Sequence, residues 1–228
     1  IEKNLKYSKN LYDKKLPIIY DVKHLSKLIG IQETYFYQAS NSQESYYRKF
    51  KIYRKDGRTR TIHEPLPNLK TIQKWILENI LYQVDVSRFA KAYIKETSIK
   101  DNVRFHINQK KILKLDIKNF FPSIKGAQIY KVFLELGYTA ELTKMFTDLS
   151  LIYNRLPQGA PTSAYLSNLS LLNFDNIVSS YCTSKKIRYT RYADDMTFSG
   201  DFNVGELIEL VKKELAKNNL FLNERKTR

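Results

Sequence analysis

The order of apolar and polar residues divides the first part of the chain into helices and one hairpin. Helical spacing over residues 1–45 predicts helices, and Asp21 and Gly30 are placed to cap one of them at its two ends. The pattern then alternates over residues 46–54. An Asp-Gly pair at 56–57 predicts a turn before a return strand over residues 59–63.

The rest of the chain alternates between helical stripes and short β-prone runs. The helices are expected at residues 72–80, 98–108, 129–136, 140–151, 161–181 and 204–215. The strands are expected at residues 111–117, 189–193, 196–199 and 221–222. This order predicts an α+β fold in which a mainly antiparallel sheet is backed by helices.

Two adjacent acidic residues, Asp194 and Asp195, separate the strands expected at 189–193 and 196–199. Asp is common in turns, so a solvated turn is the simplest interpretation of the pair. The apolar flanks and a third carboxylate, Asp116 at the end of another strand, favour a functional site instead. Three carboxylates are therefore expected to converge on one edge of the sheet.

Composition and charge indicate a basic, globular protein. Of 228 residues, 43% are hydrophobic and 27% are charged, and the formal net charge is +16. This excess predicts a polyanionic partner, and the 17 Tyr and 12 Phe suit stacking on bases, although a merely soluble basic protein is the alternative. The single cysteine, Cys182, and the lack of a signal peptide or an apolar span predict a cytoplasmic protein that does not enter a membrane.

Close carboxylates repel one another, and a hard divalent cation removes that repulsion. Oxygen ligands without Cys or His fit Mg²⁺ best. Two such ions about 3.5–4 Å apart can clamp the attacking and leaving oxygens of a phosphoryl transfer. The residues therefore predict metal-dependent phosphoryl transfer on nucleic acid, and at this point they leave polymerase and nuclease equally open.

Several motifs resemble the palm motifs of reverse transcriptases, and among these they are most similar to the retron enzymes. The motifs are Asp116 with residues 120–124 (FFPSI), residues 156–163 (LPQGAPTS) and residues 189–195 (YTRYADD). Residues 102–106 (NVRFH) resemble the Asn-Ala-x-x-His element of retron enzymes, with Val103 in place of Ala, and Ala164 stands where Pro is common. The matches run from about residue 50 to the end of the sequence.

The resemblance implies a right-hand polymerase fold. Residues 1–110 would form N-terminal helices and the fingers, and residues 111–228 would form the palm with its catalytic carboxylates. The helical thumb of the family, with its Val-Thr-Gly element, would lie outside these residues.

The resemblance also implies roles for individual residues. The catalytic residues would be Asp116, Asp194 and Asp195, which with the carbonyl of Ile117 would hold two Mg²⁺ ions. The incoming nucleotide would be bound by Lys55, Arg60, Phe121 and Gln158. RNA or the primer would be bound by Arg58, Asn102, His106, Tyr192 and Lys226.

Three of these roles have plainer alternatives. Phe121 would exclude a ribose 2′-OH, or it is simply a core residue. Lys226 would protonate the leaving pyrophosphate, or it forms a structural salt bridge. His106 is, in the plainer interpretation, a buried structural histidine.

The implied function is that of a retron RNA-directed DNA polymerase. Such an enzyme uses dNTPs to copy a structured non-coding RNA, which is both template and primer, from the 2′-OH of a specific guanosine into single-stranded DNA. It serves in anti-phage defence with an effector protein. The alternatives are another bacterial reverse transcriptase (group II intron-like, abortive-infection or CRISPR-associated) and a non-catalytic RNA-binding scaffold of the same fold.

Overall fold

The structure is a computed structural model that describes residues 2–53, 57, 59–94 and 99–228. Two of the predicted binding residues, Lys55 and Arg58, lie outside these ranges. The chain forms two compact units, and each is built from two separate segments. One unit comprises Ile1–Asp85 and Lys125–Leu166, and the other comprises Val86–Ile124 and Ser167–Arg228. The predicted boundary between fingers and palm, after residue 110, stays a prediction.

The first unit is mainly helical. Its helices are α1 (Glu2–Asp13), α2 (Val22–Ile29), α3 (Glu33–Asn41), α4 (Pro67–Asn79), α7 (Gly126–Leu136) and α8 (Ala140–Leu149), with short 3₁₀ turns at Gln43–Tyr46 and Leu81–Gln83. Helix α8 contacts α2, α3, α4 and α7, and the fully buried rings of Phe133 and Phe146 lie 5.4 Å apart between α7 and α8. The predicted caps of α2 are confirmed, because the Asp21 side chain accepts a hydrogen bond from His24 N and Gly30 adopts the left-handed conformation at φ 77°. Among the described residues, no helix combines the length and the hydropathy that crossing a membrane requires.

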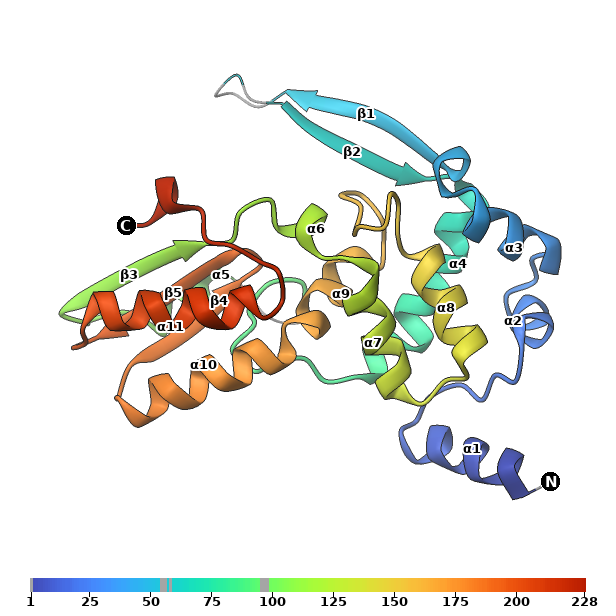
Figure 1. Cartoon of the computed structure of the whole chain (residues 1–228), viewed down its shortest axis with the longest axis horizontal. Coiled ribbons are helices and arrows are strands. Elements are labelled where there is room, and N and C mark those ends of the chain that lie inside the picture. Colours follow the sequence, from blue (N-terminus) through green and yellow to red (C-terminus); the bar gives the residue numbers. More distant parts are fainter. Residues whose placement is uncertain (1, 54–56, 58, 95–98) are drawn as a thin grey trace. The chain divides into compact units, whose positions relative to one another are not determined.

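The same unit carries the predicted hairpin, formed by β1 (Tyr47–Tyr53) and β2 (Thr59–Pro65). The two strands pair antiparallel from Tyr47↔Pro65 to Tyr53↔Thr59. Figure 1 shows the two strands side by side, and beyond Tyr47 every residue of β1 is exposed to solvent. The base of the hairpin is anchored in the core, where Gln73 Nε2 donates to Tyr47 Oη and to the carbonyl of Leu149, both at 2.7 Å.

The second unit contains a three-stranded sheet in the order β3-β5-β4, with both pairs antiparallel, as the sequence predicted. Its strands are β3 (Lys111–Asp116), β4 (Arg188–Tyr192) and β5 (Asp195–Gly200). The helices of this unit are α5 (Ile99–Arg104), α6 (Phe120–Ser123), α10 (Leu172–Ser184) and α11 (Val204–Ala216), and a 3₁₀ turn, η3, spans Glu224–Lys226. Helices α10 and α11 contact each other, and α10 packs on β4 (Figure 1).

Alternation gives the sheet two different faces. Leu113 on β3 and Tyr189 on β4 both pair with Phe198 on β5, and the rings of Tyr189 and Phe198 stack at 5.0 Å. All three side chains are buried on the face that carries the helices. The opposite face carries Asp116 and Asp195, which the register places directly across from each other.

The sequence predicted one helix from Pro161 to about Tyr181, and this was wrong. The first helix, α9, spans Ser163–Ser170, and after Leu171 the chain starts the second helix, α10. Leu171, at φ −102° and ψ 7°, interrupts the helical conformation without any Gly or Pro to signal the break. The reason lies in tertiary contacts of Asn168 and Asp175, which are described below.

Candidate active site

Two strand ends and a turn bring the predicted carboxylates together. Asp116 is the last residue of β3, Asp195 is the first residue of β5, and the two are Cα partners in the ladder. Asp194 occupies the turn before β5, and its carbonyl accepts a hydrogen bond from Ile117 N at 3.0 Å. The predicted convergence of Asp116 and Asp195 is therefore confirmed, and the backbone of Ile117 ties the end of β3 to the turn.

Asp116 is almost completely buried, and the last part of the chain covers it. Its Oδ2 accepts from Lys226 Nζ at 2.6 Å and its Oδ1 accepts from Asn223 Nδ2 at 3.0 Å. The backbone N–H of Asn223 also donates to the Asp116 carbonyl at 2.7 Å. A carboxylate that is 4% exposed needs such charge-assisted partners. Sequence reasoning named Lys226 but missed Asn223, which lies three residues earlier on the same short turn.

Asp195 is exposed, yet its surroundings disfavour the charged form of its carboxyl group. Burial of part of the group, followed by the charges of Asp194 and Asp116, raises the pKa of Asp195, and Lys226 opposes this shift. A cation placed among these oxygens would relieve the repulsion, so the donor set fits a hard divalent ion. Within the described ranges, no three His, Cys, Asp or Glu side chains are grouped so that they could hold a metal ion. Lys226 forms an ion pair with Asp116 at 2.6 Å.

Phe121 and Tyr192 are two further residues of the predicted site, and both belong to the same compact unit as the carboxylates. Asn119 adopts the left-handed conformation at φ 49° and turns the chain from β3 into the short helix α6, which carries Phe121. The Phe121 side chain is 9% exposed, and its ring lies 5.4 Å from that of Phe120 and 6.1 Å from that of Tyr93. Tyr192 is half-buried and pairs with Asp195 in the ladder.

His106 ties the segment after α5 to the sheet. Its Nδ1 lies 2.7 Å from Ser199 Oγ and its Nε2 lies 2.7 Å from Thr190 Oγ1, and the ring is buried. Burial, with smaller contributions from nearby cations, lowers the pKa of His106 to about 4, so the ring is neutral at pH 7. Asn102 lies with His106 at a pocket of about 280 Å³, and its Oδ1 is buried without a hydrogen-bond partner. RNA binding by these two residues stays a prediction.

The remaining predicted nucleotide-binding residues belong to the other compact unit, where they contact each other. Arg60 on β2 donates from Nε to Gln158 Oε1 at 2.6 Å, and the Gln158 carbonyl accepts from His63 N at 2.8 Å. Gly159, at φ 117°, permits this close approach, because a Cβ atom there would lie 2.9 Å from the carbonyl oxygen of His63. The structure therefore joins Arg60 and Gln158 into one polar group.

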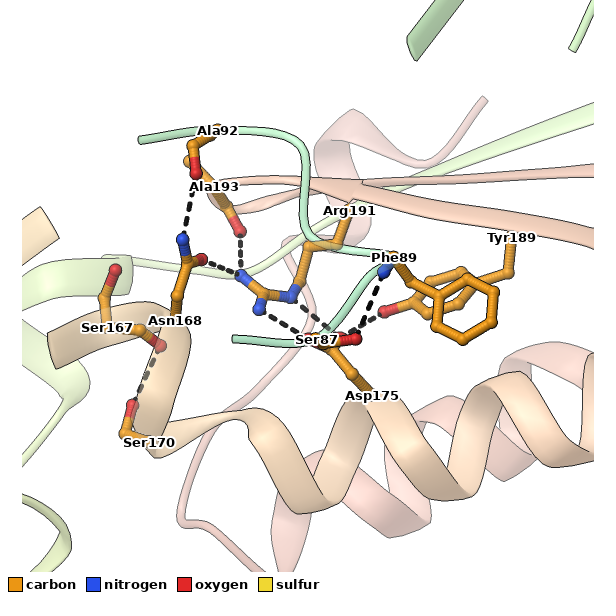
Figure 2. Close-up of polar contacts among 10 residues, drawn as sticks. All are labelled: Ser87, Phe89, Ala92, Ser167, Asn168, Ser170, Asp175, Tyr189, Arg191 and Ala193. Carbon is orange, nitrogen blue, oxygen red and sulfur yellow. Dashed lines mark hydrogen bonds and ion pairs between the residues drawn. The ribbon is translucent and has the colours of Figure 1, made fainter. Parts of the chain in front are cut away.

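A buried ion pair beside the turn that precedes β5 escaped the sequence analysis (Figure 2). Arg191 and Asp175 are both 0% exposed and are joined at 2.6 Å from Nη2 to Oδ2. Burial alone would lower the pKa of Arg191, but Asp175 outweighs it and raises that pKa, so the guanidinium stays charged. Tyr189 Oη donates to the same carboxylate at 2.7 Å. The available signal was the position of Asp175 on the helical face that it shares with the buried residues Val178 and Cys182, since a charge on an apolar face requires a buried partner.

Comparison with known proteins identifies a family and several similar relatives. The family described as reverse transcriptase (RNA-dependent DNA polymerase) matches residues 52–228. The chain is 32% identical over 216 residues to the retron Ec86 reverse transcriptase of Escherichia coli, covering 93% of this chain and 68% of that protein. It is 32% identical over 191 residues to the retron Mx65 reverse transcriptase of Myxococcus xanthus, covering 76% and 45%, respectively.

Solved structures agree on the fold. A telomerase structure from Candida albicans, solved with a fragment of telomeric RNA, superimposes with a TM-score of 0.54 at 14% identity and covers 80% of this chain and 42% of that one. At this identity the likeness concerns the fold alone, and it confirms the predicted right-hand polymerase architecture. Together with the match over residues 52–228 and the retron relatives, it shows that the chain belongs to the reverse transcriptases, the RNA-directed DNA polymerases, and is of the retron type.

Proposed function

We propose that this chain carries the catalytic centre of a retron polymerase that copies a structured RNA into DNA by two-metal phosphoryl transfer. The observation that carries the proposal is the ladder pairing of Asp116 with Asp195, beside Asp194 in the turn. Family members use divalent metal ions, and we assign two Mg²⁺ ions here because every donor is a carboxylate or backbone oxygen. When bound, the ions would supply the charge that stabilises the attacking and leaving oxygens.

The protein groups have distinct tasks in this proposal. Asp116, Asp194 and Asp195 hold the ions, with the Ile117 carbonyl as a further ligand. Lys226 pairs with the buried Asp116 carboxylate and orients it, which its 2.6 Å contact supports. This contact favours the salt-bridge role over direct protonation of pyrophosphate.

The remaining assignments concern the substrate. Arg60 and Gln158 bind the nucleotide, because the Arg60 guanidinium retains donors for phosphate oxygens after its single bond to Gln158. Phe121 limits the space for a 2′-OH. Lys55, Arg58, Asn102, His106 and Tyr192 keep their proposed contacts with nucleotide or RNA.

The wider biology is proposed from the relatives. The chain spans 68% of the Ec86 enzyme and about half of several other curated relatives. We infer that the complete protein uses a structured non-coding RNA as template and primer and dNTPs as substrates. We further propose that its DNA product and an effector protein act with it in anti-phage defence. The net charge of +16 supports the polyanionic partner.

Primer extension with purified protein tests the catalytic assignment. Asp194→Asn and Asp116→Asn should each abolish Mg²⁺-dependent DNA synthesis and leave RNA affinity nearly unchanged, since each removes a ligand charge. Asp201→Asn is the matched control, because Asp201 is exposed and follows the far end of β5. Synthesis that survives in Asp194→Asn would refute the assignment, and a wild-type protein that binds RNA without extending it would support the scaffold alternative.

A further inference from the structure

Arg191 bonds through all three guanidinium nitrogens inside the protein (Figure 2). Its Nε and Nη2 donate to the two oxygens of Asp175 at 2.9 and 2.6 Å. Its Nη1 donates to Asn168 Oδ1 and to the carbonyl of Ala193, both at 3.1 Å. The side chain is 0% exposed, so water does not compete for these donors.

The same network holds a segment from elsewhere in the chain. Arg191 N donates to the Phe89 carbonyl at 2.8 Å, and the Arg191 carbonyl accepts from Lys91 N at 2.7 Å. Asn168 Nδ2 donates to the Ala92 carbonyl at 2.9 Å. Figure 2 shows helices α9 and α10, strand β4 and residues 87–92 meeting around this one arginine.

The break between α9 and α10 makes this convergence possible. Asn168 and Asp175 are seven residues apart, and a straight helix would separate them by about 10 Å along its axis. One guanidinium group spans far less than that distance. The interruption at Leu171 brings both side chains within hydrogen-bonding distance of Arg191.

The bond to Ala193 reaches the catalytic turn itself. Ala193 precedes Asp194 and adopts the left-handed conformation at φ 57°, which costs a non-glycine residue about 1–2 kcal/mol. Arg191 Nη1 donates to the carbonyl of this strained residue, and that carbonyl belongs to the peptide bond that joins Ala193 to Asp194. A shift of the turn would therefore leave a buried charged donor without its acceptor.

We propose that Arg191 is a positioning residue that fixes the turn carrying Asp194 and Asp195, and that Asp175 and Asn168 hold Arg191 in place. This inference rests on the proposed catalytic function of the turn. A buried ion pair is weak evidence for a stabilising role, since apolar residues of similar volume often replace one at little cost in stability. The specific contribution of the Arg191–Asp175 pair is to orient the guanidinium group so that Nη1 points at the Ala193 carbonyl.

The test uses the double variant Arg191→Met/Asp175→Leu in the full-length protein. It removes both charges together, so it leaves no buried ion without a partner. We expect a melting temperature close to that of the wild type, faster amide exchange of residues 192–195, and a loss of about 100-fold in the maximal rate of primer extension. The KM for dNTP should change little, because Arg191 does not lie among the residues assigned to the nucleotide.

Two further variants keep the test decisive. Tyr189→Phe removes one hydrogen bond to Asp175 and leaves the bonds of Arg191 to Asp175, Asn168 and Ala193 in place, so it should keep the wild-type rate. Asn168→Ala removes one acceptor of Nη1 and keeps the ion pair, so it should speed exchange of the turn and slow synthesis even if the double variant does not fold.

Two outcomes separate this inference from the function on which it rests. A folded double variant, or a folded Asn168→Ala, with wild-type exchange and rate would overturn the positioning role. If the wild type made no DNA, the proposed function would fail. Exchange of residues 192–195 would still decide whether Arg191 orders the turn.

Discussion

Replacement of Phe121 by Val separates a role in sugar selection from a role in packing. The Phe121 ring is 9% exposed and lies against Phe120 and Tyr93, five residues after the metal-binding Asp116 proposed here. If the ring closes the space beneath the sugar, the smaller side chain admits a 2′-OH. If the ring only fills the core, the change affects stability alone.

The size of the loss in stability and the size of the change in sugar selectivity can both be estimated. Val keeps about three of the seven side-chain carbons, so the change removes about four buried carbons, worth about 3 kcal/mol at about 0.8 kcal/mol each. For a chain of this size that loss corresponds to a melting temperature lower by about 6–12 °C. A pocket that rejects a ligand only because of one added hydroxyl group disfavours that ligand by about 100-fold. The preference for dNTP over rNTP should therefore fall by about that factor in Phe121→Val.

The assay compares incorporation of matched dNTP and rNTP on one primer–template beside thermal melting. Phe120→Val is the control, because Phe120 is the adjacent residue, is 4% exposed and loses the same number of carbons. We expect both variants to melt early and only Phe121→Val to accept ribonucleotides. A folded Phe121→Val with the wild-type preference would make Phe121 a packing residue, and a changed preference in Phe120→Val would move the gate to Phe120.

Three other predictions concern charge. Asp195→Asn should raise the melting temperature of the metal-free protein, because it removes a partly desolvated charge beside Asp194. By the same reasoning, the stability that Asp195 contributes is fully present below its ordinary pKa of 3.8 and is lost as the pH rises through its raised folded pKa. When wild type and variant are melted at pH values from below 3.8 to neutrality, the difference between their melting temperatures should therefore grow. A difference that stays constant with pH would contradict this. Asp175→Leu alone should lower the free energy of unfolding, measured by urea denaturation, by about 3–5 kcal/mol, since it leaves Arg191 buried and unpaired. Adding Arg191→Met should recover most of that loss. Equal stability of the single and double variants would argue against the ion pair. RNA affinity should fall linearly with salt on a log–log plot, whereas Arg60→Ala should raise the KM for dNTP with little change in that slope, and a flat salt response would exclude phosphate contacts as the main attraction.

Local patterns in the sequence determined most of the elements and part of the site. Asp21 and Gly30 mark the ends of α2, and alternation over residues 111–117 and 189–199 identifies the strands. Because Asp116 and Asp195 stand at strand ends, the antiparallel order was enough to predict that they meet. These features follow from short-range physics, since capping, turn formation and side-chain periodicity each depend on residues only a few positions apart.

The tertiary structure alone decided the break at Leu171, the cover over Asp116 and the network around Arg191. Asn168, Asp175 and Arg191 each conform to their local pattern, and nothing in that pattern states that one guanidinium will bond both helices and the turn before β5. Asn223 likewise reaches Asp116 from 107 positions away in sequence. Such partners are selected in the packed core, where buried charges and amides must find hydrogen-bond acceptors. Leaving these groups unpaired costs more free energy than interrupting a helix. Because the partners are distant in sequence, their pairing produces no local periodicity from which it could be predicted.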